Sequence, residues 1–500
     1  MSNLNPSQQA AIDYSPGHLL IVAGPGTGKT HTLTQRIARL AAQPKNNQRM
    51  LAITFTNKAA LEMKERLSRL LSDTEERIFV GTFHSFCLEI LQQYGTAVNL
   101  PRDFRVAAPK EIEAFAKILW PKQSASARKN ILEKVSHWKA VEFQHPPPLD
   151  AETYNDFLRQ KGMVDFDDLL LKTVELLTKN CALLAEFKNI YHHIFVDEYQ
   201  DINPIQHILL KKLVERGAHI SAIGDPNQAI YGFRGGHVKF FESFAEDFPG
   251  AATLSLGENY RSARNLLSAS GQVIAKGRFQ YVANSTAKIF EQGRLAIYEA
   301  PTEKAEAEYV VHQIERMVGG TSMFSQDSGR VARYSKAERT FGDIAVLYRL
   351  NSQANALKTA FERSGIPYDI SGDKSLAEDC LPREEKKYAA RSENVSLMTL
   401  HACKGLEFPV VFIVGCEENL LPLHLPSMTS DAEEERRLFY VGMTRAKEEL
   451  HFLRAKKRFL YGKMCQNSVS PFLADIEEEL KTYEHTHSAR KPAKAEKQLD

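Results

Sequence analysis

Short apolar runs along this chain alternate with segments in which apolar residues recur at helical spacing. Leu19–Ala23 is followed by one helical pattern, and residues 50–54 are followed by another over residues 58–71. Two further apolar runs, 193–196 and 220–224, end in polar residues. Because each unit reads as a buried strand followed by a helix or a polar loop, the pattern predicts an α/β fold with a parallel sheet.

The same alternation resumes after residue 256. We expect helices over residues 305–317 and 351–364 and strands over residues 344–348 and 410–414. These elements predict a second sheet domain.

Three polar stretches separate or follow these elements. Residues 319–340 predict a solvated loop, residues 371–394 a short charged connection, and residues 481–500 a disordered tail.

The segment from residue 95 to residue 187 is helical and polar, interrupted by Pro146–Pro148. Apolar residues at 112, 115, 118 and 119, and again at 166, 169, 170 and 174, recur at helical spacing. They predict a small helical subdomain inserted in the first sheet domain and packed apart from its sheet.

Composition describes an ordinary water-soluble protein. The 500 residues are 43% hydrophobic and 25% charged, with a formal net charge of +2, so any phosphate-binding groove must come from local arrangement. We expect no secretory signal, because residues 1–13 are polar. We expect no membrane span, because no apolar run approaches the roughly 18 residues that a span requires. The six cysteines are scattered without a C-x-x-C pair, which disfavours metal clusters and disulfides and favours the cytoplasm.

A glycine-rich loop joins the first predicted strand to its helix. It reads Ala23, Gly24, Pro25, Gly26, Thr27, Gly28, Lys29 and Thr30. Apart from Ala23, this matches the G-x-x-x-x-G-K-[ST] pattern, in which backbone N–H groups and a helix N-terminus cradle phosphates. Lys29 would reach the outer phosphates and the Thr30 hydroxyl would bind magnesium. The alternative is a chance glycine turn, which the flanking strand and helix disfavour.

Two adjacent acids, Asp197 and Glu198, end the run 193–196. Paired acids at a strand end are usually a turn or a helix cap. Beside a phosphate loop, however, Asp197 is expected to hold the metal and Glu198 to act as general base toward the attacking water.

The loop after residues 220–224 carries Gln228, whose amide is predicted to contact the terminal phosphate, and then Tyr231, Phe233 and Arg234. One loop would thus join nucleotide chemistry to a surface on which bases stack.

Other polar and aromatic positions leave two interpretations open. Gln8, just before the phosphate loop, is either a reader of the adenine edge or a surface glutamine. Phe55 could stack on a base or lie in the core, and for Phe83 we expect the core.

Tyr260 and Arg261 are either nucleotide contacts or the start of a helix with an exposed arginine, and the spacing does not decide between these interpretations. The charge run of residues 431–446 fits a helix dipole and could be purely structural.

Taken together and in order, these stretches resemble the superfamily 1 DNA helicases of the UvrD, Rep and PcrA type. The resemblance runs from Leu4 to about Leu473. It rests on Thr54-Phe55-Thr56-Asn57-Lys58-Ala59-Ala60, Val196-Asp197-Glu198, Asn259-Tyr260-Arg261-Ser262 and Tyr440-Val441-Gly442-Met443-Thr444-Arg445-Ala446.

The resemblance implies a role for each matching position. It implies catalytic roles for Lys29, Asp197, Glu198, Gln228, Arg261 and Arg445, the two arginines being fingers supplied by the second domain. It implies nucleotide contacts at Gln8, residues 23–30, Tyr260 and Glu407, and Mg²⁺ at Thr30 and Asp197. It implies contacts with single-stranded DNA at Phe55, His84, Tyr231, Phe233, Arg234 and His401.

The resemblance also implies two RecA-like parallel-sheet domains in tandem with the inserted helical subdomain. The expected division is residues 1–94 and 188–255 for motor domain 1, 95–187 for the insertion, 256–475 for motor domain 2, and 476–500 for a polar tail.

Three positions depart from the family pattern. Phe233 stands where better-known members carry tryptophan, and His31 stands where they carry an arginine near the adenine. The connection 371–394 is too short for the domain usually called 2B, which suggests a short motor whose monomer is not self-inhibited.

The function that these features predict is an ATP-dependent 3′ to 5′ DNA helicase or translocase, using ATP and Mg²⁺, in DNA repair or replication restart. Its expected partners are single-stranded DNA and single/double-strand junctions. One alternative is a DNA-stimulated ATPase or translocase that needs a partner to unwind duplex. Another is a nucleotide-gated binding module that hydrolyses slowly, which Glu198, Gln228 and both arginines disfavour.

Overall fold

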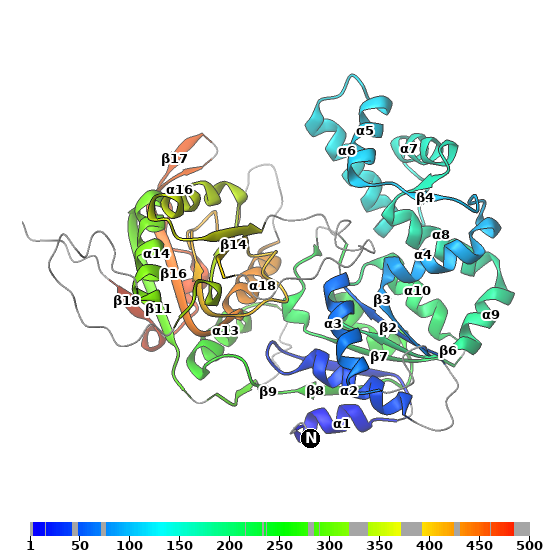
Figure 1. Cartoon of the computed structure of the whole chain (residues 1–500), viewed down its shortest axis with the longest axis horizontal. Coiled ribbons are helices and arrows are strands. Elements are labelled where there is room, and N and C mark those ends of the chain that lie inside the picture. The colour runs from blue at the N-terminus through cyan, green and yellow to red at the C-terminus, as the bar shows by residue number, and fades with distance from the viewer. Residues whose placement is uncertain are drawn as a thin grey trace, which may run out of the picture.

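The computed structural model describes two sheet domains joined in tandem. The residues it describes are 4–15, 17–42, 49–71, 77–215, 217–232, 235–236, 238–278, 285–289, 291–319, 339–371, 393–424, 431–460 and 462–484. Figure 1 shows the two sheets in separate lobes, with a helical arm projecting from the first. The predicted α/β fold class is confirmed.

The first sheet has six parallel strands in the order β3-β2-β6-β7-β1-β8. Their bounds are β1 Leu19–Ala23, β2 Arg49–Thr54, β3 Ile78–Thr82, β6 Tyr191–Val196, β7 His219–Gly224 and β8 Ala252–Leu256. The helices around it are α1 Pro6–Asp13, α2 Lys29–Ala41, α3 Asn57–Ser68, α4 Phe83–Tyr94 and α10 Pro204–Val214. One face packs on α2 and α3, and the other on α4 and α10. In a parallel sheet all carboxyl ends share one edge, where ligands bind.

The helical arm lies within the first sheet domain. It contains α5 Pro109–Leu119, α6 Ala125–His137, a π-helical turn Trp138–Glu142 and α7 Leu149–Gln160, with their own small core. The two-stranded parallel pair of β4 Arg105–Val106 and β5 Met163–Val164, which sequence patterning did not predict, closes its base.

The prediction that residues 166, 169, 170 and 174 pack apart from the sheet is wrong. They lie on α8 Phe166–Lys179, whose apolar face shares the core of the first sheet with residues such as Leu51 and Ile53. Helical spacing defines an apolar face but not the surface that covers it. The following helix, α9 Cys181–Ile190, leads back into β6.

The second sheet follows the order β13-β14-β12-β15-β16-β11-β18, with β17 paired to β16. Its strands are β11 Arg294–Thr302, β12 Ile344–Tyr348, β13 Tyr368–Ser371, β14 Val395–Thr399, β15 Phe408–Ile413, β16 Ala446–Leu460, β17 Lys463–Cys465 and β18 Thr482–Glu484. Helices α14 Glu303–Val318 and α16 Ala354–Ser364 pack on one face. Helices α13 Arg264–Ala275 and α18 Ala432–Met443 pack on the other. Between the two sheets, β9 Glu258–Asn259 pairs with β10 Thr286–Ala287.

The predicted start of the disordered tail, at residue 481, lies too early in the chain. Residues 478–480 form a 3₁₀ turn, and β18 adds to the edge of the second sheet beside β11. The three residues of β18 contain no hydrophobic run, and they join the sheet through backbone hydrogen bonds to β11. A pattern of hydrophobic positions does not predict such a strand. The polar stretch 319–340, the connection 371–394 and the rest of the tail lie largely outside the described residues.

No helix in the described part of the chain is long and apolar enough to cross a membrane.

Candidate functional site

The glycine-rich loop occupies the turn between β1 and α2. Gly28 caps α2 in the left-handed region at φ +79°, and Gly26 has φ +69°. A Cβ at Gly26 would come within 2.6 Å of the Arg261 Cβ, so only glycine fits there. The buried Thr27 hydroxyl donates to the Gly24 carbonyl over 2.8 Å and fixes the loop. The N-terminus of α2 is therefore open to an anion at the carboxyl edge of the sheet.

Thr30 and Asp197 come together at this edge. The Thr30 hydroxyl donates to Asp197 Oδ2 over 3.4 Å, and Lys29 Nζ bends back to the Gly24 carbonyl at 3.4 Å. Burial, and then the charge of Glu198, raises the pKa of Asp197 to about 7. A hydroxyl and a carboxylate are the hard oxygen ligands that Mg²⁺ prefers, with water and phosphate oxygens completing the shell. The donor set therefore fits magnesium bound together with a phosphate chain.

Glu198 lies beside Asp197 in a strained backbone conformation, with φ +52° in the left-handed region. Such strain in a non-glycine residue concentrates at functional sites. Its carboxylate accepts a hydrogen bond from the Gln200 amide. Burial alone would raise its pKa, but attraction to Lys29 and Lys404 and the Gln200 hydrogen bond outweigh burial and lower it. Glu198 is thus held as a carboxylate, which suits a base.

Gln228 is buried between the two domains. Its Nε2 donates to Asp225 Oδ2 over 2.7 Å, and its Oε1 accepts from Arg445 Nη2 at 3.1 Å. Arg445 follows α18 of the second domain and is only 2% exposed. Burial lowers its pKa to about 10, so it remains a cation at neutral pH.

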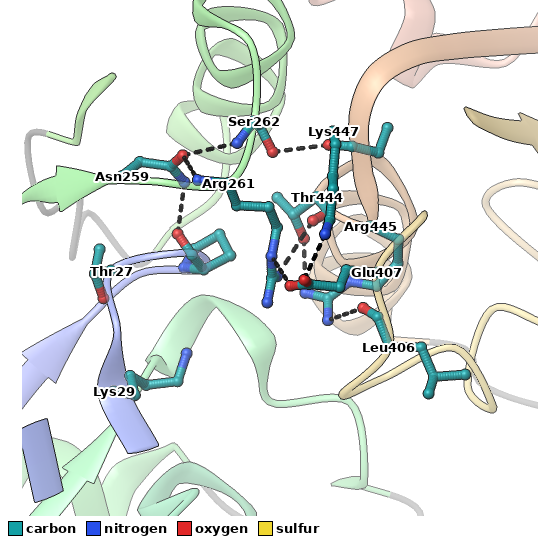
Figure 2. A network of polar contacts seen from close by, with 12 residues as sticks. Thr27, Lys29, Asn259, Arg261, Ser262, Leu406, Glu407, Thr444, Arg445 and Lys447 are labelled. Carbon is teal, nitrogen blue, oxygen red and sulfur yellow. Dashed lines mark hydrogen bonds and ion pairs between the residues drawn. The ribbon is translucent and has the colours of Figure 1, made fainter. Parts of the chain in front are cut away.

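Arg261 enters the same region from the segment after β9. Its Nε lies 2.6 Å from Glu407 Oε2, and Glu407 Oε1 lies 2.6 Å from Lys447 Nζ. Figure 2 shows the Arg261 side chain descending between the glycine-rich loop with Lys29 and the Arg445 segment. Glu407, the expected nucleotide contact, pairs with two cations of its own domain. In this arrangement a phosphate would compete with Glu407 for Arg261.

The two candidate adenine contacts differ in exposure. The Gln8 amide is 5% exposed and both its polar atoms are used: Oε1 accepts from the Asn5 N–H, and Nε2 donates to the Thr27 carbonyl. Tyr260 is 45% exposed, and its hydroxyl accepts from Asn5 and donates to Glu258. Gln8 thus supports the loop, while the Tyr260 ring is accessible for stacking.

Of the expected DNA contacts that the structure describes, Phe55 and Tyr231 lie on loops of the first domain, His84 lies in the first turn of α4, and His401 lies in the second domain. The rings of Phe55 and Tyr231 stack with centroids 5.1 Å apart, although the residues come from different loops. The ring of His84 packs edge-on against Phe166, and burial lowers its pKa to about 4. His401 follows β14 and is half-buried. Phe233 and Arg234 lie outside the described residues.

Phe83, for which we expected the core, is 5% exposed and belongs to the core of the first sheet. That prediction is confirmed.

Sequence reasoning missed two residues that join the domains. Lys404, from the second domain, lies 2.5 Å from Asp201 Oδ2 and 2.7 Å from the Gln228 carbonyl oxygen. Asn259 Nδ2 donates to the Pro25 carbonyl over 2.7 Å. Asn259 stands inside a stretch that carried the resemblance and Lys404 stands outside those stretches, but only the fold reveals the partners of either residue.

Two parallel sheets whose segments converge on one glycine-rich loop define the class of tandem RecA-like α/β proteins. The chain belongs to the UvrD/REP helicase family. The family model described as UvrD/REP helicase N-terminal domain matches residues 4–249, and the model described as UvrD-like helicase C-terminal domain matches residues 254–379 and 374–457. The expected family is confirmed.

Two curated relatives illustrate the similarity. An ATP-dependent DNA helicase PcrA of Staphylococcus aureus (strain MRSA252) is 27% identical over 657 aligned positions, covering 96% of this chain and 87% of the relative. The corresponding Staphylococcus epidermidis protein (strain ATCC 35984) is 28% identical over 659 positions, with the same coverage.

Proposed function

We propose that this protein is an ATP-dependent DNA helicase or translocase that couples ATP hydrolysis to 3′ to 5′ movement on single-stranded DNA. The observation that carries the proposal is the approach of two arginines of the second domain, Arg261 and Arg445, to the glycine-rich loop and Gln228 of the first. The phosphates of an ATP molecule between the domains would be held by the glycine-rich loop of the first domain on one side and by Arg261 and Arg445 of the second domain on the other. Hydrolysis would release that link, so the domains would move relative to each other.

Each side chain has a step in the proposed mechanism. The loop N–H groups and Lys29 hold the phosphates, and Glu198 takes a proton from the attacking water. Gln228 and Arg445, already hydrogen-bonded to each other, and Arg261 stabilise the charge on the transferred phosphoryl oxygens. Thr30 and Asp197 would hold Mg²⁺, which supplies charge neutralisation at the phosphates when bound. Tyr260 would stack on the adenine, with Gln8 beside it.

The DNA track would run over the edge that carries Phe55, Tyr231, His84 and His401, with Phe233 and Arg234 expected beside them. The stacked rings of Phe55 and Tyr231 provide flat surfaces that accept any base. Lys404 lies over the Tyr231 ring at 5.1 Å and also bonds the Gln228 carbonyl. This contact offers a route from the stacking surface to the phosphate sensor.

The proposed domain division is residues 1–94 with 188–255, the insertion 95–187, and 256–475. We also propose that the connection 371–394 holds no 2B domain. The relatives align over 657 positions, whereas this chain has 500 residues, so part of their length has no counterpart here. A second candidate function follows, a DNA-stimulated ATPase or translocase that needs a partner to unwind duplex.

Single-stranded DNA and single/double-strand junctions are the proposed partners, the cytoplasm the proposed location, and repair or replication restart the proposed process. The decisive experiment measures ATP turnover with and without single-stranded DNA, together with unwinding of duplexes carrying a 3′ or a 5′ tail. We expect DNA-stimulated turnover and unwinding from the 3′ tail only. DNA-stimulated ATP turnover without unwinding of either substrate would favour the second candidate function. ATP turnover that single-stranded DNA does not stimulate would rule out both candidate functions.

A further inference from the structure

Asn259 is a fully buried amide at the point where the second domain touches the glycine-rich loop. It has no exposed surface, and it lies on β9, whose pairing with β10 includes a hydrogen bond from the Lys288 N–H to its carbonyl. Its backbone is therefore fixed in the second domain, while its side chain reaches toward the first (Figure 2).

The two ends of this amide serve different domains. Nδ2 donates to the Pro25 carbonyl over 2.7 Å, in the glycine-rich loop. Oδ1 accepts from the N–H groups of Arg261 at 2.9 Å and Ser262 at 3.0 Å. An amide is the side chain that provides a donor and a two-fold acceptor at this length. One planar group thus sets the loop and the backbone of Arg261 in a single geometry.

Close packing reinforces this link. The Tyr260 N–H donates to the Gly26 carbonyl over 2.8 Å. A Cβ on Gly26 would lie 2.7 Å from Asn259 Nδ2 and 2.6 Å from Arg261 Cβ, so the two segments are in direct contact. A displacement of the loop carbonyls therefore moves the start of the Arg261 side chain.

The far end of Arg261 is held by side-chain and carbonyl partners in the second domain. Its Nε lies in an ion pair with Glu407 at 2.6 Å, a carboxylate whose place an anionic phosphate oxygen can take. Its Nη1 reaches the Thr444 carbonyl only at 3.5 Å. The guanidinium can therefore exchange partners, provided that its backbone stays in place.

We propose that Asn259 is a positioning residue that sets Arg261 relative to the glycine-rich loop and transmits the state of that loop to the second domain. This inference rests on the proposed function, because it requires that Arg261 act on the ATP phosphates. Asn259 itself contacts no reacting atom. It acts through the Arg261 backbone on one side and the Pro25 carbonyl on the other.

The test is a double-mutant cycle of N259A and R261A, read by DNA-stimulated ATP turnover. Misplacement of a catalytic group by about 1 Å costs on the order of 100-fold in rate, so we expect N259A to lower kcat by about 10- to 100-fold. KM for ATP should change by less than about threefold, since uniform ground-state binding is retained. In the R261A background, N259A should add less than about a twofold loss, because residues that act as one unit are not additive.

Asn265 supplies a matched control. Its amide also holds a backbone segment, because it donates to the Gly293 carbonyl and accepts from the Gly293 N–H, both at 2.7 Å. Asn265 and Gly293, however, both belong to the second domain. N265A should leave kcat within about twofold of the wild type. An equal loss in N265A, or a full additional loss from N259A on R261A, would overturn the inference.

N259D separates the two ends of the amide. It keeps the acceptor for Arg261 and Ser262 but loses the donor to Pro25, so we expect a kcat loss smaller than that of N259A with the same non-additivity. If N259A fails to fold, as judged by its thermal unfolding midpoint, the cycle is run with N259D. A wild-type protein without DNA-stimulated turnover would instead refute the proposed function, and the two failures are therefore distinguishable.

Discussion

Arg445 of the second domain donates a hydrogen bond to Gln228 of the first, with 3.1 Å between Nη2 and Oε1, and both side chains are buried. The bond joins residues 217 positions apart, next to the glycine-rich loop. If this pair senses the terminal phosphate, Q228A should lower kcat for ATP about 10²- to 10³-fold by removing a transition-state contact, with little change in nucleotide affinity. Steady-state kinetics with and without single-stranded DNA checks this. An unchanged kcat would separate Gln228 from the chemistry.

The strained Glu198 provides the next prediction. Since it is held as a carboxylate beside Asp197, E198Q should reduce turnover by about 10²- to 10⁴-fold, the usual contribution of a general base, while ATP still binds. Fluorescent-nucleotide titration and phosphate release measure the two effects. The exposed Glu418, changed to glutamine, is the control and should retain wild-type turnover. Retained DNA-stimulated turnover in E198Q would exclude the base role.

The buried ion pair of Lys404 with Asp201 bridges the domains. Breaking one side of such a pair costs about 3–5 kcal/mol when the remaining charge stays buried. Burial already raises the pKa of Asp201 to about 7, so protonation will relieve part of this cost in K404M. We expect K404M to open the domain interface and to lower DNA-stimulated turnover, and K404M with D201N to recover part of the closed population.

Fluorescence energy transfer between dyes on the two lobes reports this opening. K456M is the matched control, because Lys456 pairs with Glu299 on the surface of the second domain. Identical transfer efficiencies in K404M and K456M would show that the bridge does not hold the interface.

The stacked pair of Phe55 and Tyr231 predicts an effect on DNA binding. F55A should weaken binding of single-stranded DNA by about 1–3 kcal/mol, the range for one lost aromatic platform. Fluorescence anisotropy with a labelled oligonucleotide measures this. Phe115 forms a ring pair with Phe157 in the helical arm, 5.2 Å between centroids, and F115A should leave the affinity unchanged. Equal losses in both variants would point to general destabilisation.

His193 on β6 makes stability depend on pH. Burial, and then its neighbours His219 and Arg36, lowers its pKa to about 4 in the folded protein. The ordinary value is about 6.5, so the unfolded state binds more protons and stability falls as pH drops from 6.5 toward 4. The loss between pH 7 and pH 5 is about 2 kcal/mol from this group.

Thermal unfolding of H193Q should therefore lose less stability on acidification than the wild type. The exposed His137, changed to glutamine, should leave the pH dependence as it is. Parallel pH curves for H193Q and the wild type would contradict this assignment.

Local sequence determined the strands, the loop and the chemistry of single positions. The strand predicted at 344–348 matches β12, and the apolar run Leu19–Ala23 forms β1, because these patterns record burial on a sheet. The glycines of the loop indicate positions with backbone angles that other residues rarely adopt, and the adjacent acids Asp197 and Glu198 mark the end of a strand. Family membership followed from these stretches, while the roles of the individual residues stay predictions.

Only the tertiary structure decided which distant groups meet. It placed α8 on the first sheet, added β18 to the second, paired Glu407 with two cations, and gave Asn259 and Lys404 partners across the domain interface. The periodicity of a helix specifies an apolar face but not the surface that packs on it. The sequence around a polar side chain does not indicate which acceptor about 200 residues away it will contact. Those contacts arise when two separately encoded sheets pack against the same loop.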